Sequence, residues 1–196
     1  PVIAIYSTFL QRGIDQIFHD VALQRNIAPV FAIDRAGIVG ADGPTHHGVL
    51  DLTYLLMIPE LIIMAPADEY ELIGMLKLAV SLDKPCAVRY PRANILGDKI
   101  PDINDPATDI VFGEPQILLH QKSDKLLILG VGPAVKRVAK IIEENKLPAT
   151  VVNCRFVKPL NAEFYIRWIG GFEKIITIEE NTTIGGFGAY INNFIN

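Results

Sequence analysis

The sequence predicts an α/β fold made of two blocks, each with a parallel or mixed sheet flanked by helices. Short apolar runs of strand length alternate with longer stretches in which apolar residues recur at helical spacing. A stretch rich in proline and acidic residues divides this series in two. Half of the 196 residues are hydrophobic and the mean hydropathy is +0.30. The chain can therefore bury a sizeable core, and its alternation favours parallel βαβ units.

The first block is expected over residues 1–95. Its apolar runs predict strands at residues 2–6, 30–34, 61–65 and 86–90. Helical periodicity between these runs predicts helices at residues 9–25, 48–57 and 69–82. Asp68, followed three residues later by Glu71, has the pattern of an N-cap and capping box at the start of the third helix.

Residues 96–116 are expected to link the blocks, because they hold three prolines and five acidic residues without helical or strand periodicity. The second block is expected over residues 117–196. Its predicted strands are residues 125–132, 149–154 and 174–180, and its predicted helices are residues 133–146, residues 161–169 and a last helix after the turn at residues 185–188. This turn ends the stretch EENTTIGGFG, which is expected to pack tightly rather than to hold a phosphate.

Charge, hydropathy and cysteine content narrow the class of protein. The net charge is −4 with acids and bases interspersed, unlike the basic surface of nucleic-acid-binding proteins. No apolar run has the length of a membrane span. Cys86 and Cys154 lie far apart within apolar runs, which predicts reduced core thiols and a cytoplasmic protein. Because the chain begins directly in a strand and ends in an amphipathic stretch, we expect it to be part of a larger protein.

Polar residues follow three of the predicted strands of the first block. In open parallel sheets, ligands bind beyond the carboxyl ends of the strands, which selects residues 7–12, 34–48 and 91–94. Arg12, Arg35 and Arg92 lie in these loops and predict a convergent site for a phosphate or carboxylate. The alternative is that they are surface arginines paired with nearby acids. Arg89, which lies inside a strand, is expected to be structural.

The stretch from Gly40 to Gly48 holds two of the four histidines of the chain, His46 and His47. Histidine exchanges protons near neutral pH, and Asp42 could orient a histidine ring or bind a substrate hydroxyl, so a catalytic loop is one reading. A polar connector is the other, and composition alone does not separate them. A metal site is not expected, because adjacent histidines diverge and further ligands at suitable spacing are lacking.

Tyr6 and Phe9 flank the first of these loops. An aromatic ring beside an arginine at the edge of a sheet can stack on a flat heterocycle, although such a phenylalanine is also common in cores.

Five strings of the chain match one known family. They are YSTFLQRGIDQIFHDVALQ, FAIDRAGIVGADGPTHHG, IPELIIMAPADEYEL, AVRYPRAN and VVNCRFVKPL. They resemble sequences of the 1-deoxy-D-xylulose-5-phosphate synthase family. The members of this family are thiamine-diphosphate enzymes of the transketolase superfamily. The resemblance implies a pyrimidine-binding-like domain followed by a transketolase C-terminal-like domain. It also implies an activity, the decarboxylating condensation of pyruvate with D-glyceraldehyde 3-phosphate to 1-deoxy-D-xylulose 5-phosphate, a precursor of isoprenoids, thiamine and pyridoxal.

The resemblance assigns roles to individual residues. Arg35 and Arg92 match ligands of the acceptor's phosphate, while Tyr6 and Arg12 match other positions on the substrate side. His46 and Asp42 match the polar partners of the reacting groups, with His46 or Asp42 moving protons. Phe9 matches the ring that stacks on the aminopyrimidine of thiamine diphosphate.

The resemblance also sets limits. The family's segment for Mg²⁺ and the diphosphate, and the glutamate that activates the cofactor, have no counterpart in this sequence, so the chain alone is expected to be inactive. A homodimer is implied, with neither nucleic acid nor membrane as a partner. Two alternatives remain: a β-type subunit of a 2-oxo-acid dehydrogenase, and a dimerisation module without chemistry.

Overall fold

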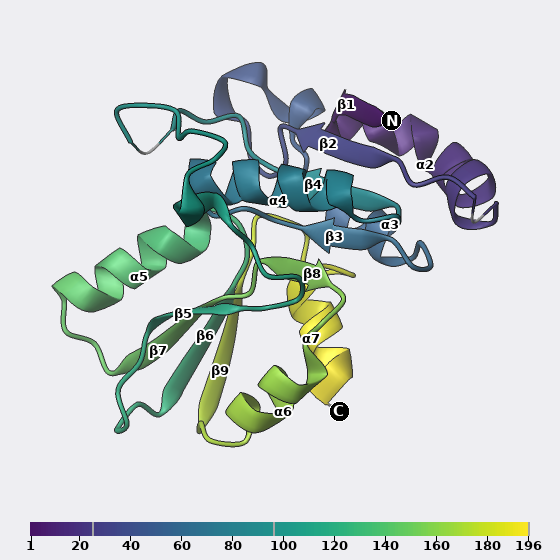
Figure 1. The fold of residues 1–196 in the computed structure, drawn as a ribbon. Coiled ribbons are helices and arrows are strands. Elements are labelled where there is room, and N and C mark those ends of the chain that lie inside the picture. Colours follow the sequence, from purple (N-terminus) through teal and green to yellow (C-terminus); the bar gives the residue numbers. More distant parts are fainter. Residues whose placement is uncertain (25, 96, 196) are drawn as a thin grey trace.

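We analysed a computed structural model of the chain, which describes residues 1–24, 26–95 and 97–195. Arg25, the last residue of the first predicted helix, Leu96, the first residue of the predicted link, and Asn196 lie outside the described residues. The chain forms two sheets, one above the other in the view of Figure 1.

The first sheet has the strand order β1-β2-β4-β3-β8. Its strands are β1 (Val2–Tyr6), β2 (Val30–Asp34), β3 (Ile62–Met64), β4 (Cys86–Arg89) and β8 (Phe156–Lys158). The first four are parallel, as the alternating pattern predicts, so their carboxyl ends share one edge. The fifth, β8, comes from the second block and pairs antiparallel with β3.

Helices cover both faces of this sheet because successive strand residues point to opposite sides. On one face, Met75 and Ala79 of α4 (Glu69–Ser81) pack against Val30, Met64 and Val88 of the strands. The other face is covered by a continuous helical stretch, residues 7–22, and by α3 (Asp51–Leu56). The stretch includes α1 (Ser7–Leu10) and α2 (Ile14–Gln16), separated by a 3₁₀ turn, and ends in a π-helical segment, Ile17–Ala22.

The second sheet has the strand order β5-β7-β6-β9. Its strands are β5 (Gln116–Leu119), β6 (Leu126–Gly130), β7 (Ala149–Asn153) and β9 (Lys174–Ile178). Strand β6 is parallel to both β7 and β9, whereas β5 pairs antiparallel with β7. The helix α5 (Ala134–Glu144) packs on one face, and α6 (Ala162–Ile169) and α7 (Phe187–Ile195) lie on the other (Figure 1).

The largest core cluster joins the two blocks. Leu127 and Val152 of the second sheet belong to the same buried cluster as Ile33 and Leu55 of the first block. The blocks are therefore packed through shared apolar side chains and not only through the connecting segment.

The sequence pattern does not predict two of the strands. Residues 116–119 form β5, although the pattern places residue 116 in the link, and residues 156–158 form β8 in a stretch without a predicted element. Both are short and antiparallel, and their pairing depends on distant partners, which local periodicity cannot reveal. The remaining predicted strands and helices are present with ends shifted by a few residues, and the first helix begins at Ser7 and ends at Ala22.

The capping box predicted at α4 is half right. Asp68 is the N-cap, and its carboxylate accepts a hydrogen bond from the Glu71 amide at 2.8 Å. The Glu71 carboxylate does not return to Asp68. It is buried and accepts hydrogen bonds from the amide of Ala67 (2.8 Å), from Asn153 Nδ2 (2.8 Å) and from Arg155 Nε (2.7 Å). Because two of these partners lie at the end of β7 and just after it, Glu71 ties α4 to the second block.

Candidate functional site

The candidate site lies at the shared carboxyl edge of β1, β2 and β4. Tyr6 is the last residue of β1, Arg35 follows β2 directly, and Arg92 lies three residues beyond β4. Parallel pairing in register places Tyr6 opposite Asp34, and Ile33 opposite Arg89. Residues from three distant parts of the sequence therefore meet at this edge.

Arg35 is held in an unusual backbone conformation. Its φ of 59° lies in the left-handed region, which is uncommon for residues other than glycine and often marks functional positions. Its guanidinium stacks on Tyr6, with Cζ 3.8 Å from the ring centroid. It also forms an ion pair with Asp34, and its Nε donates to Asp42 Oδ2 at 2.9 Å. The side chain is thus fixed by a ring and two carboxylates.

Asp42 joins the two arginines of the edge. Its Oδ2 accepts from Arg35 Nε, and its Oδ1 accepts from Arg92 Nη1 at 3.0 Å. Both guanidiniums therefore reach one anionic group. Asp42 lies in a 3₁₀ turn between Gly40 and Gly43, whose φ values of 55° and 77° are accessible to glycine at little cost.

Electrostatics keeps Arg35 charged. Burial by itself lowers the pKa of Arg35, but the hydrogen bond to Asp42 and the negative charge of Asp34 outweigh it and raise the pKa above its ordinary value. Arg92 is more open, with 48% of its side chain exposed. Each guanidinium has five N–H donors, so both arginines retain donors beyond those used in the structure.

An aromatic platform adjoins the arginines. The rings of Tyr6 and Phe9 stack with centroids 5.2 Å apart, and Phe9 meets the ring of His46 edge-on at 5.5 Å. Phe9 is 44% exposed and so is not the core residue that the alternative reading allowed. His46 Nδ1 lies 3.0 Å from the hydroxyl of Thr45, which orients the imidazole. The platform thus combines an open ring face with a proton-exchanging side chain.

His47 and Arg12 lie outside this cluster. His47 Nδ1 accepts a hydrogen bond from the Val39 amide at 3.1 Å, so this histidine holds the loop together. Arg12 is exposed and lines a hollow with Met57 and Ile58. Within the described residues, its side chain makes no hydrogen bond or ion pair with the other predicted site residues.

Sequence reasoning expected a structural role for Arg89 but missed the groups that pair with it and with Arg35. The buried Arg89, expected to be structural, donates from Nε to the buried Asp51 at 2.9 Å and also bonds the carbonyl of Glu180 at 3.2 Å. The Glu180 side chain lies against Gly37, where a Cβ atom would collide with it. Asp34, which pairs with Arg35, is also missing from the predicted site. Only the position of Asp34 at a strand end could have indicated it.

The turn EENTTIGGFG is tightly packed, as predicted. Glu179 accepts hydrogen bonds from the amides of Phe187 (2.8 Å) and Gly188 (2.7 Å), the first residues of α7. A carboxylate of the chain thus occupies the amides that a phosphate would need. Cys86 and Cys154 are free and buried, as expected of core thiols.

The residues of the site fit one part of a thiamine-type cofactor. The partly exposed ring of Phe9, beside His46, suits a flat heterocycle such as an aminopyrimidine. Over residues 1–24, 26–95 and 97–195, no group of three or more His, Cys, Asp or Glu is arranged to hold a metal ion. In the same described ranges, no helix is long and apolar enough to cross a membrane.

Fold and site together define an α/β protein of two units, with a candidate site at the carboxyl ends of β1, β2 and β4. Two family models match it: the pyrimidine-binding domain of transketolase over residues 1–96, and the transketolase C-terminal domain over residues 116–196. The chain therefore belongs to the transketolase family. A solved structure of a split-gene transketolase, described as an inactive β4 tetramer, superimposes with a TM-score of 0.82 at 22% identity, covering 100% of this chain and 62% of that one.

Curated relatives confirm the narrower resemblance seen in the sequence. The chain is 49% identical to a 1-deoxy-D-xylulose-5-phosphate synthase of Syntrophus aciditrophicus and 46% identical to that of Halothermothrix orenii, with 100% of this chain covered in both. It is also 49% identical, over 97% of its length, to 1-deoxy-D-xylulose-5-phosphate synthase 1 of Geobacter sulfurreducens. The chain spans about 30% of the length of each of these relatives.

Proposed function

We propose that this chain is the pyrimidine-binding and C-terminal part of a thiamine-diphosphate-dependent transferase. The complete protein would condense pyruvate with D-glyceraldehyde 3-phosphate, with loss of carbon dioxide, to 1-deoxy-D-xylulose 5-phosphate. That product serves isoprenoid, thiamine and pyridoxal synthesis. The proposal is supported by similarity along the whole chain to synthases with this name. Catalysis would need the part of such a protein that this chain does not span.

The observation that carries the proposal is the convergence of Arg35 and Arg92 on Asp42. The Asp42 carboxylate receives one N–H from each guanidinium, at 2.9 and 3.0 Å, as two oxygens of a phosphate would. In our proposal the phosphate of the acceptor binds between the same two arginines. Asp42, on its glycine-flanked turn, then accepts a hydrogen bond from a hydroxyl of the substrate. Arg12 stays a prediction from the resemblance, without support from contacts in this chain.

The neighbouring residues suit the other end of the reaction. Phe9 would stack on the aminopyrimidine, and His46, edge-on to Phe9, would give or take a proton at the reacting oxygen. Tyr6 would keep Arg35 aimed at the acceptor. Thiamine diphosphate, when bound, supplies the carbanion chemistry, and its diphosphate and Mg²⁺ would be held outside this chain. We further infer a cytoplasmic protein, in keeping with two free buried thiols, and a homodimer, as the family resemblance implies.

The test is Arg92→Ala in the complete protein, with both Michaelis constants measured. Loss of a charge-assisted hydrogen bond to the phosphate, worth about 1.5–3 kcal/mol, should raise KM for D-glyceraldehyde 3-phosphate by roughly ten-fold or more. KM for pyruvate should stay within about two-fold of its original value, because the binding of pyruvate does not involve this arginine. Arg167→Ala, an exposed arginine on α6, is the matched control and should change neither constant.

An equal rise in both constants would rule out the phosphate role of Arg92. The same protein also tests the enzyme class. A β-type subunit of a 2-oxo-acid dehydrogenase would pass its acyl group to a lipoyl acceptor and would not use D-glyceraldehyde 3-phosphate as an acceptor. Turnover with a lipoyl acceptor, but none with D-glyceraldehyde 3-phosphate, would therefore replace our proposal with that alternative.

A further inference from the structure

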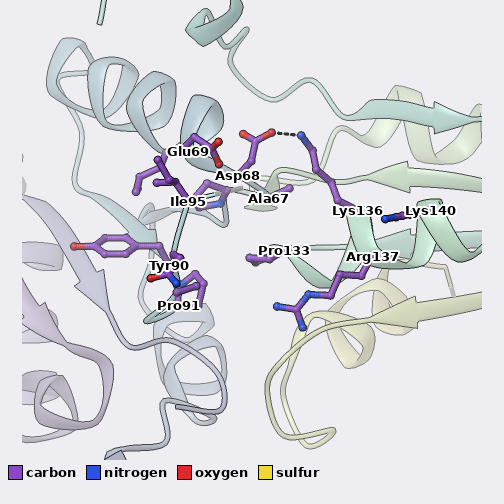
Figure 2. Close-up of a pocket in the computed structure, with 14 residues that line it drawn as sticks. Ala67, Asp68, Glu69, Tyr90, Pro91, Ile95, Pro133, Lys136, Arg137 and Lys140 are labelled. Atoms are coloured by element: carbon purple, nitrogen blue, oxygen red, sulfur yellow. Dashed lines mark hydrogen bonds and ion pairs between the residues drawn. The ribbon is translucent and has the colours of Figure 1, made fainter. Parts of the chain in front are cut away.

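A cavity that the proposed chemistry does not use lies where the two blocks meet. It has a volume of about 380 Å³, within the usual range for small-molecule pockets. One wall comes from the segment after β3 with the start of α4, and from the segment after β4; the other is the first half of α5. In Figure 2, Pro91 lies opposite Pro133 and Arg137 across this space, whereas the ring of Tyr90 points away from it.

Most of the lining is apolar. Tyr90 and Leu72 are partly buried side chains that also pack against the α4 core cluster. The other apolar residues that line the cavity are Pro66, Ala67, Pro91, Ala93, Ile95 and Pro133. Such walls suit the hydrocarbon or ring part of a ligand.

The wall formed by α5 is positively charged. Lys136, Arg137 and Lys140 line the cavity against two carboxylates, Asp68 and Glu69. Lys136 is already paired with Asp68, as the dashed line in Figure 2 shows. Lys140 makes a long contact with the exposed Glu144 at 3.8 Å, which contributes little.

Arg137 is the cation available to a ligand. Among the residues that the structure describes, its guanidinium has neither an ion-pair nor a hydrogen-bond partner. In Figure 2 its side chain extends from α5 past Pro133, along the cavity.

The start of α5 adds to this field. No side chain caps the helix, in contrast to α4, capped by Asp68, and α6, capped by Asn161. The amide of Val135 donates to the carbonyl of Gly132 at 3.3 Å, and the start of this eleven-residue helix still places the positive end of its dipole beside Pro133, at the cavity wall.

We propose that this cavity binds a small organic anion, with an apolar or aromatic body against Leu72, Pro91 and Pro133 and one phosphate or carboxylate at Arg137 and the start of α5. The site is separate from the cluster of Arg35, Asp42 and Arg92 and does not rest on the proposed function. It does share a wall with that cluster, because Pro91 and Ala93 line the cavity and flank Arg92.

The probe is phenyl phosphate, titrated into the full chain by isothermal calorimetry. Every variant carries Arg92→Ala, so that the cluster of Arg35, Asp42 and Arg92 binds the anion less well. Adding Arg137→Ala should lower the affinity by roughly ten-fold or more, as expected when a charge-assisted hydrogen bond is lost. Adding Arg167→Ala instead, the exposed arginine of α6, should leave it unchanged. Circular dichroism of each variant checks that the fold is kept.

Related ligands separate the two halves of the site. Inorganic phosphate lacks the apolar body and phenol lacks the charge, so both should bind roughly ten-fold more weakly than phenyl phosphate or worse. Benzoate in place of phenyl phosphate shows which anion the site prefers, and tight binding of either supports the proposal. An affinity unaffected by Arg137→Ala, or phenol binding as tightly as phenyl phosphate, would overturn it, as would no detectable binding of either aromatic anion.

Discussion

Replacing Glu71 by glutamine tests whether this buried carboxylate holds the two blocks together. The change keeps the shape of the side chain but removes its charge, and it points an amide where Arg155 Nε now donates at 2.7 Å. The pair is largely shielded, with 5% of the Glu71 side chain and 17% of the Arg155 side chain exposed. Breaking a buried pair by removing one partner costs about 3–5 kcal/mol.

The expected loss for Glu71→Gln is somewhat smaller than that. Glutamine still offers one oxygen, at the place of Oε2, to the Ala67 amide and to Asn153 Nδ2 (3.0 Å), so we expect the free energy of unfolding to fall by about 2–4 kcal/mol. For a chain of this size, each kcal/mol lowers Tm by about 2–4 °C. The melting temperature should therefore drop by roughly 4–16 °C.

Urea unfolding, followed by two signals, is the assay. Far-ultraviolet circular dichroism reports on both blocks, whereas fluorescence of the single tryptophan, Trp168 on α6, reports on the second. Glu144→Gln is the matched control, because Glu144 is 60% exposed and only loosely paired, and it should stay within about 0.5 kcal/mol of the original chain. A Glu71→Gln variant as stable as this control would refute the reasoning.

Three further predictions follow from the site and the core. In the complete protein, His46→Ala should lower kcat by about 10²–10⁴-fold, the range for general acid–base groups, and an unchanged kcat/KM would exclude that role. Burial raises the pKa of Cys86 to about 11 and that of Cys154 to about 12, so neither thiol of the folded chain should react with iodoacetamide at pH 8, although both should after unfolding. The two thiols of the folded chain stay protonated at pH values above the ordinary thiol pKa of about 8.5, whereas those of the unfolded chain do not. The free energy of unfolding should therefore fall as the pH rises from about 9 towards 11, and a flat profile of this energy against pH would contradict the prediction. Gly74→Ala should destabilise the chain by about 1–3 kcal/mol in urea, because its Cβ would collide with a carbonyl of the connecting segment, whereas Gly170→Ala, in open space, should not.

The sequence indicates the parallel part of the fold well because the signal is local. Apolar runs such as residues 30–34 and 86–90 are buried on both faces, and the helices between them bury one stripe. Parallel strands place their carboxyl ends at one edge, so residue order alone predicts that Tyr6, Arg35 and Arg92 meet. The fold brings these three together, with Asp42 between the arginines.

Other features of the site depend on contacts that periodicity does not encode. Arg12 has the residue type and the loop position of a ligand, yet its exposed side chain lies beside Met57 and Ile58. Glu71 has the spacing of a capping box, yet it is drawn to Arg155, 84 residues away. A local pattern names the nearest partner that a side chain can reach, whereas burial in the folded chain selects the partner that best satisfies its charge.

The sequence by itself determined the α/β class, the edge of the sheet at which we propose that ligands bind, and the family, since these follow from residue order and local spacing. Only the tertiary structure decided how the blocks join. It placed β8 beside β3, buried Glu71 between α4 and β7, and left a cavity between α5 and the segment after β4. These features arise where surfaces distant in sequence pack together, and their energies depend on burial and geometry that no stretch of the chain specifies alone.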